Sequence, residues 1–237
     1  MGSQSREKKA RRIQRIAEPF LIKYPDNLDP QDKALFALEN EVILKVIETL
    51  MNNPSGLIPL ARNLSGFLEV TLRAMDSMFA AKGFNPLACH KGCNWCCHLH
   101  VDINQAEAMS IAGYLKEMPE KRRQQILQKL EDTERIVAEI TPKERRVAKI
   151  PCAFLGEDGA CQIYPVRPLG CQNFHSMDAT VCQISWEGGE DKLVVNEYRA
   201  LLGGYVMGGF KKGLQAMGYD YSESELHRAV KNCMLIS

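Results

Sequence analysis

The sequence predicts a mainly α protein, in which helical flanks surround an irregular, cysteine-rich metal-binding core with at most a short β-hairpin. Three observations predict this class. Apolar residues recur at steps of three and four in the first 88 residues and again after residue 196, as they do along one face of a helix. Prolines and glycines interrupt the chain between residues 150 and 182. Eight of the nine cysteines lie between Cys89 and Cys182.

We divide the chain into three parts on these patterns. Residues 1–84 form a helical N-terminal region, residues 85–185 form the cysteine-cluster metal-binding domain, and residues 186–237 form a helical C-terminal region that packs on the core.

The N-terminal region is expected to contain a helical hairpin. Asp29 in the N-cap position and Pro30 in the first helical position predict a helix start, and residues 53–56 (Asn-Pro-Ser-Gly) predict its end. A second helix follows Pro59, carries Phe67 on its apolar stripe, and closes at Gly83.

The middle of the chain begins with little regular structure. Alternating apolar residues at 99–103 predict a short strand at most. Asn104 and Glu107 form a capping-box pattern that starts a helix ending near Pro119. The charged stretch 120–149 keeps one apolar stripe, as a solvated helical face does. Residues 152–164 read as a short hairpin that turns at 156–159.

The C-terminal region returns to helix from residue 196 to 217. Two pairs of glycines spaced by four, at 204 and 208 and at 209 and 213, predict close backbone packing against another element. A final helix is expected to start near Ser222 and to carry Glu225, Leu226, Val230 and Cys233.

Composition excludes several classes of protein. Of the 237 residues, 45% are hydrophobic and 25% are charged, which is ordinary for a globular chain. A net charge of +1 leaves no excess for a polyanion and disfavours nucleic-acid binding. The sequence lacks a run of about 18 apolar residues, so we expect no membrane association. The basic N-terminus precedes no hydrophobic segment and is not a signal peptide, so we expect a cytoplasmic protein.

Four thiols lie within nine residues, at Cys89, Cys93, Cys96 and Cys97. Thiolates that close would repel one another, and a bound cation removes this conflict, so metal ligation is favoured over thiol exchange. Thiolates suit zinc and iron–sulfur clusters. Adjacent side chains diverge, so the Cys96–Cys97 pair predicts either two metal centres or one cluster with a spare thiol nearby.

The cysteine segment closely resembles a known family. Cys89-x₃-Cys93-x₂-Cys96-Cys97 is followed by the motifs at 151–155 (PCAFL), 159–164 (GACQIY) and 167–174 (RPLGCQNF). In this order they resemble the zinc- or iron-chelating cysteine-cluster family, often called YkgJ-like, over roughly residues 85–180. The resemblance implies a bacterial, cytoplasmic protein with a small, mostly helical metal-binding domain. The flagellin lysine N-methylases carry a similar cysteine cluster, and iron–sulfur and S-adenosylmethionine chemistry has been associated with them.

The residues around the cysteines could have either a chemical role at the metal or a purely structural one. The Arg167 guanidinium either donates to a cluster sulfide or bound thiolate, or ties the loop to backbone carbonyls. Trp95, Tyr164 and Phe174 are expected to form an apolar lid over the site, rather than to react.

Other polar residues in this window are weaker candidates. An extended segment would place His98, His100 and Asp102 on one face. His175 and Cys182 are candidate additional ligands that the sequence leaves open. Outside the window, Cys233 is expected to be a packed thiol, and His227 has no visible partner.

We predict that seven thiols bind iron, as an iron–sulfur cluster of the 4Fe-4S type, or zinc: Cys89, Cys93, Cys96, Cys97, Cys152, Cys161 and Cys171. Three hypotheses follow for function. The chain is a redox or group-transfer enzyme that resembles the flagellin lysine N-methylases, with S-adenosylmethionine as a second cofactor and an unidentified protein partner or substrate. Alternatively, it is a non-catalytic, zinc-stabilised interaction module, or a protein that stores or traffics metal.

Overall fold

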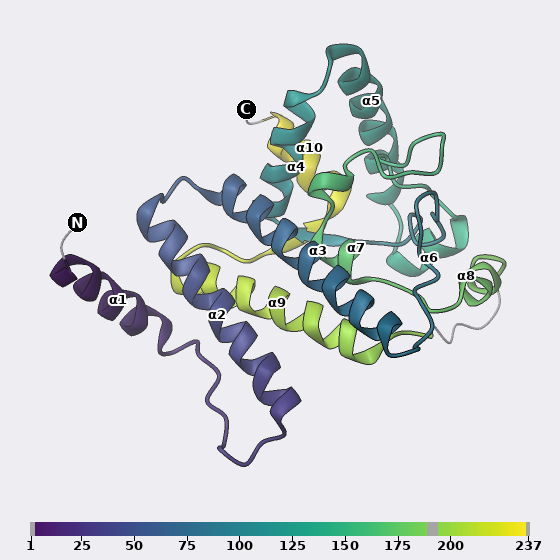
Figure 1. The fold of residues 1–237 in the computed structure, drawn as a ribbon. Helices are drawn as coiled ribbons and strands as arrows, with labels where there is room; N and C mark the ends of the chain where they lie inside the picture. Colours follow the sequence, from purple (N-terminus) through teal and green to yellow (C-terminus); the bar gives the residue numbers. More distant parts are fainter. Residues whose placement is uncertain (1–2, 189–193, 236–237) are drawn as a thin grey trace.

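The computed structural model describes residues 3–188 and 194–235, and it confirms the mainly α class. Figure 1 shows two groups of helices, with the irregular segments from the middle of the chain along one side of them. The described elements are α1 (Ser3–Ala17), α2 (Pro30–Asn52), α3 (Leu57–Ala81), β1 (Asp102–Asn104), α4 (Gln105–Glu117), α5 (Glu120–Val137), α6 (Pro142–Ala148), a 3₁₀ turn (Tyr164–Val166), α7 (Leu169–Asn173), α8 (Ala179–Trp186), α9 (Glu197–Ala216), β2 (Glu223–Glu225) and α10 (Leu226–Leu235).

The predicted N-terminal hairpin is confirmed as α2 and α3. Asp29 caps α2 by accepting a hydrogen bond from the backbone N–H of Gln31 at 2.8 Å. Helix α3 starts at Leu57, before the expected Pro59, because proline costs no hydrogen bond within the first turn of a helix. Phe67 is 42% exposed, so its place on the buried stripe was wrong. The buried stripe instead runs through residues such as Leu64 and Leu68.

Helix α9 packs tightly against α2, as the glycine spacing predicted. A Cβ on Gly209 would lie 2.7 Å from the Glu39 carbonyl oxygen, and one on Gly213 would lie 2.6 Å from the Val46 Cβ. Gly204, by contrast, has nothing within 4 Å of that position. A Cβ on Gly208 would lie 2.8 Å from the Glu39 Oε1, so three of the four glycines lie against α2 and let the two helices approach each other.

Two main apolar cores result. The first joins α2, α3 and α9, with Leu68, Val206 and Phe210 among its buried members. The second joins α4, α5, α10 and the segment 153–166, with Ile111 and Phe154 at its centre.

The short strands connect the second core to the C-terminus. Strand β1 confirms the short strand expected near 99–103, and it pairs antiparallel with β2, with Ile103 opposite Ser224. The final helix therefore begins at Leu226 rather than near Ser222, and Glu225 belongs to β2. The predicted start was wrong because pairing with a strand about 120 residues earlier leaves no local pattern.

The charged stretch 120–149 forms two helices, α5 and α6, separated by a new capping box at Thr141 and Glu144. The predicted hairpin at 152–164 is reduced to a single bridge between Leu155 and Cys161, closed by a turn at Gly156–Gly159. Among the described residues, no helix is long and apolar enough to cross a membrane.

Candidate metal centre

The loop with the first four cysteines is a succession of tight turns. The N–H of Cys93 bonds to the His90 carbonyl at 3.0 Å, and the N–H of Cys97 bonds to the Asn94 carbonyl at 2.9 Å. The loop lies against the tip of the second cysteine segment, where Gly159 has a φ of +74° and a Cβ would meet the Gly92 oxygen at 3.1 Å. Glycine at 159 thus permits both the turn and the close approach of the two segments.

A backbone hydrogen bond connects the two segments at the cysteines themselves. The N–H of Cys152 donates to the carbonyl of Cys97 at 2.7 Å. Cys161 lies across the bridge from Leu155, so Cys152 and Cys161 belong to one hairpin. Cysteines 55 residues apart in sequence are therefore fixed next to each other.

Cys171 lies on the short helix α7, which is held from α4. The Glu107 carboxylate completes the capping box with Asn104 and also accepts a hydrogen bond from the Leu169 N–H at 2.9 Å. The Gln172 side chain donates to Ser65 at 2.6 Å. The capping box was predicted, but its second contact was not, because it is made to a residue 62 positions away.

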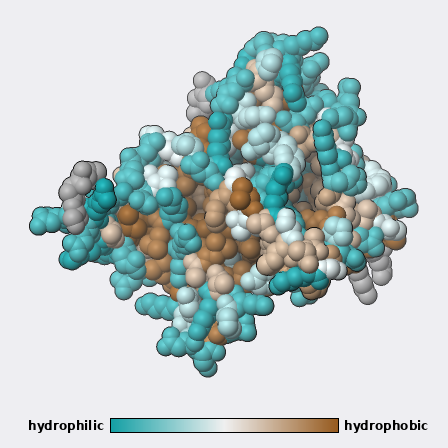
Figure 2. Space-filling view, in the orientation of Figure 1, coloured by the Kyte–Doolittle hydropathy of each residue, from teal (hydrophilic) through white to brown (hydrophobic). Residues whose placement is uncertain are grey.

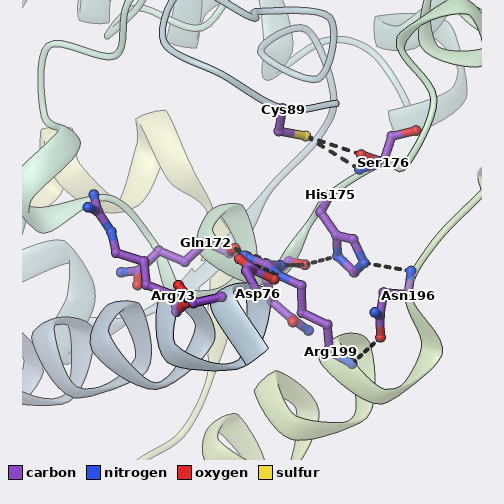
Figure 3. A network of polar contacts seen from close by, with 10 residues as sticks. Arg73, Asp76, Cys89, Gln172, His175, Ser176, Asn196 and Arg199 are labelled. Carbon is purple, nitrogen blue, oxygen red and sulfur yellow. Dashed lines mark hydrogen bonds and ion pairs between the residues drawn. The ribbon is translucent and has the colours of Figure 1, made fainter. Parts of the chain in front are cut away.

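Cys89 is held from the far side of α7. Its sulfur accepts a hydrogen bond from the Ser176 N–H at 3.4 Å, and the Ala88 N–H donates to the Ser176 carbonyl at 3.0 Å. Figure 3 shows this pair above a buried polar network around Arg199. The Arg199 guanidinium donates to Asp76 at 3.2 Å and to the Asn173 carbonyl at 3.1 Å.

His175 belongs to this network, and it is not free to act as the additional ligand that the sequence left open. Its Nδ1 donates to the Asn173 carbonyl at 2.8 Å, and its Nε2 accepts from the Asn196 N–H at 2.9 Å (Figure 3). Burial lowers the pKa of His175, which keeps the ring neutral as these two bonds require. Both ring nitrogens are thus used to connect α7 to the start of α9.

Cys182 lies on α8, which packs on the first cysteine loop. Trp186, one turn further along α8, has its ring centroid 6.1 Å from that of Trp95 and 4.2 Å from that of His98. Residues four apart share one face of a helix, so Cys182 faces the same loop as Trp186.

The histidines after the cysteine loop do not gather as one set. His100 and Asp102 pair with each other at 2.9 Å, as expected for residues on one face of an extended segment. His98 instead packs against Trp186. Of the expected lid residues, Tyr164 and Phe174 are each 41% exposed, whereas Trp95 is half-buried against α8.

The thiols influence one another electrostatically. Burial first, and neighbouring thiolates second, raise the pKa of Cys152 and of Cys171 to about 12. A hydrogen bond with the Cys97 thiol raises the pKa of Cys96. Desolvation likewise raises the pKa values of Cys89 and Cys93. Without a cation, these thiols are protonated at neutral pH.

Arg167 is a cation close to several of these thiols. Its charge lowers the pKa values of Cys96, Cys161 and Cys171, against the larger effects that raise them. The guanidinium lies 4.2 Å from the centroid of the Tyr164 ring, and its Nε is buried without a hydrogen-bond partner. The alternative in which the Arg167 side chain ties the loop to backbone carbonyls has no such contact among the described residues.

A second buried network supports the hairpin, and the sequence did not reveal it. His227 is fully buried; its Nδ1 donates to Glu225 at 2.6 Å, and its Nε2 accepts from the Ala153 N–H at 3.1 Å. Arg145 pairs with the same carboxylate at 2.7 Å. The view that His227 lacks a partner was therefore wrong. Its partners come from residues 74 positions away or from an unpredicted strand.

The donor set suits a thiophilic metal, although the side chains are not yet arranged around one. Among residues 3–188 and 194–235, no group of three or more His, Cys, Asp or Glu side chains is placed to hold an ion. All seven predicted cysteines are free thiols on loops or short elements that converge from three segments. Soft thiolates suit zinc and iron, and a cation would reverse the rise in their pKa values. Cys233 instead packs in the second core, as expected.

Comparison with known proteins gives one finding. Residues 88–194 match the model of the CxxCxxCC family, described as a "Putative zinc- or iron-chelating domain". No curated protein and no solved structure matches the chain. The predicted resemblance is confirmed over residues 88–194, and the description of the family supports metal binding by this part of the chain.

Proposed function

We propose that this protein holds iron in an iron–sulfur cluster of the 4Fe-4S type. The match of residues 88–194 to the family model described as a "Putative zinc- or iron-chelating domain" supports this proposal. The proposed ligands are drawn from the seven thiols at Cys89, Cys93, Cys96, Cys97, Cys152, Cys161 and Cys171. The observation that carries the proposal is the convergence of these thiols from three chain segments, connected by the bond between Cys152 and Cys97.

The seven thiols exceed the four ligands of either a 4Fe-4S cluster or a structural zinc site, so their number alone does not favour iron over zinc. Buried charge favours the cluster. The unpartnered Nε of Arg167 can donate to a metal-bound sulfur, and such bonds tune the reduction potential of clusters.

The cluster would supply one-electron transfer or a Lewis-acidic iron when bound. The protein's own residues would bind the cluster, shield it and set its charge. Glu107 and Arg199 fix the two ends of α7 around Cys171, while Trp95 and Trp186 cover the first loop. The reducing bacterial cytoplasm, which we propose as the location, keeps such thiols available for metal.

Methyl transfer from S-adenosylmethionine to a protein lysine extends this proposal. It is supported by the likeness of the cysteine cluster to that of the flagellin lysine N-methylases. Adding S-adenosylmethionine to the metal-loaded protein should raise its melting temperature, because a ligand stabilises the state that binds it. A metal-loaded protein whose melting temperature does not respond would remove this extension and leave the cluster proposal intact.

Substitution of a single ligand tests the cluster proposal directly. Cys93→Ser should lose metal and lower the melting temperature, because the site draws three segments of the domain together. Cys233→Ser should keep its full metal content, since that thiol packs in the second core and is not among the proposed ligands. Full metal content and an unchanged melting temperature in Cys93→Ser would refute the assignment.

A zinc-stabilised interaction module is the second candidate, and one observation favours it. Figure 2 shows apolar surface over α2, α3 and α9 on one face of the molecule. Large apolar residues of these helices are exposed, among them Phe67, Val70 and Met78 on α3, and Leu201 on α9. Stoichiometric zinc in place of iron would favour this function, because the metal would then only stabilise the surface.

A further inference from the structure

Cys182 lies outside the seven-thiol set, but the structure holds it at the same site from both sides. The segment before it is fixed by Ser176, whose backbone bonds to Ala88 and to the Cys89 sulfur. The segment after it is fixed by Trp186, which packs on Trp95 and His98. Residues 176–186 therefore run alongside residues 88–98, and Cys182 lies between the two points of attachment.

The helix phase directs Cys182 toward the first loop. Trp186 follows Cys182 by four residues in α8, so both lie on one face of the helix. That face is the one in contact with the loop, because the Trp186 ring lies against it. The electrostatics agree with this placement, because negative charge on Cys182 raises the pKa values of both Cys89 and Cys93.

A second group of three thiols comes from the second cysteine segment. Cys152 and Cys161 belong to the hairpin, and Cys171 lies on α7. Negative charge on Cys171 or Cys161 raises the pKa of Cys152, and negative charge on Cys161 raises the pKa of Cys171. This group contacts the first loop at Cys97, whose carbonyl accepts a hydrogen bond from the Cys152 N–H.

The adjacent cysteines lie between the two groups. Cys96 couples electrostatically to Cys89 and Cys93 on one side, and to Cys161 and Cys171 on the other. In this conformation the Cys96 and Cys97 thiols share a hydrogen bond, which cannot persist once both are thiolates bound to metal. Neighbouring side chains diverge, so the pair can supply one thiol to each group.

We propose that Cys182 is a metal ligand, and that eight thiols form two four-thiol iron–sulfur sites. One site comprises Cys89, Cys93, Cys182 and one member of the Cys96–Cys97 pair. The other comprises Cys152, Cys161, Cys171 and the remaining member. This inference rests on the proposed function, and it accounts for the adjacent cysteines, the eighth thiol and the absence of any spare thiol within residues 89–182.

Iron stoichiometry tests the division into two sites. The full chain and its variants are reconstituted anaerobically with iron and sulfide, and iron per folded chain is measured, with far-ultraviolet circular dichroism to establish that each variant is folded. Cys182→Ser should retain half the iron of the parent protein, because it loses one site. Cys161→Ser should also retain half, because it loses the other, and the double variant should retain almost none. Cys233→Ser is the matched control and should retain all of it.

The opposite outcomes separate the inference from the proposed function. Cys182→Ser with the full iron content of the parent would overturn the role of Cys182 and leave the cluster proposal standing. Complete loss of iron in both folded single variants would overturn the two-site division, because a single shared centre behaves in that way. A parent chain that takes up no iron and sulfide would instead overturn the proposed function itself.

Discussion

Glu225 is the residue that connects the second core to the hairpin of the metal site. Its carboxylate pairs with Arg145 at 2.7 Å, accepts from His227 Nδ1 at 2.6 Å, and caps α10 by accepting from the His227 N–H at 2.8 Å. Arg145 is 1% exposed, so its charge depends on this one carboxylate. His227 Nε2 in turn accepts a hydrogen bond from the Ala153 N–H, next to Cys152.

Glu225→Gln should therefore destabilise the protein by about 3–5 kcal/mol, because it leaves the buried Arg145 charge without its counter-ion. Urea unfolding measures this loss. Glu117→Gln removes the carboxylate of an exposed pair with Arg62, and it should cost at most about 1 kcal/mol. Equal losses of unfolding free energy in the two variants would show that the buried pair stabilises the protein no more than the exposed pair does.

The same carboxylate predicts a pH dependence. Burial would raise the pKa of Glu225, but His227, Arg145 and the backbone of α10 outweigh burial and lower it from 4.5 to about 2. A lowered pKa stabilises the folded state above the unfolded value, and this stabilisation is lost as the pH falls through the folded value. The stability difference between the parent and Glu225→Gln should thus shrink as the pH falls from 4.5 to 2. A difference that stays constant over this range would contradict the pKa assignment.

The thiols make a further prediction at the residue scale. Burial raises the pKa of Cys152 and Cys171 to about 12, so both are protonated in the metal-free protein at neutral pH. Metal binding must displace these protons, because the thiolate is the ligand. Titration of the metal-free protein with zinc in weak buffer should release about one proton per thiol ligand. Zinc binding without proton release would show that the cysteines are not the ligands.

At the scale of elements, the close contact between α2 and α9 gives a direct test of the helix packing. Gly209→Ala should destabilise the protein by about 1–3 kcal/mol, because its Cβ would meet the Glu39 oxygen at 2.7 Å. Gly204→Ala lies in the same helix with open space around it, and should stabilise by about 0.5–1 kcal/mol through helix propensity. Thermal unfolding of both variants decides the point, and destabilisation by Gly204→Ala would contradict the helix orientation.

Elements with local signals were predictable from the sequence. Asp29 and Pro30 gave the start of α2, and the Asn104–Glu107 capping box gave the start of α4. Strand β2 and the true start of α10 were missed, because pairing with β1 determines them and no neighbouring residue indicates it. Local pattern therefore specifies helix ends, whereas long-range pairing specifies the strands.

At the scale of the whole molecule, the cysteine segment was predictable as a motif but not as a site. Its family was evident from the order of cysteines, and the match over residues 88–194 agrees. The polar networks around Arg199 and Glu225 were not evident, because each joins residues 70 or more positions apart. These networks connect the two helical flanks to the cysteine segment from opposite sides, so metal binding and the packing of the flanks should be coupled.

Anaerobic purification, followed by an absorption spectrum and by iron, sulfide and zinc analysis of one sample, tests the central claim most directly. We expect a brown protein that contains iron and acid-labile sulfide in equal amounts, with visible sulfur-to-iron absorption. A colourless protein with stoichiometric zinc and no sulfide would contradict it.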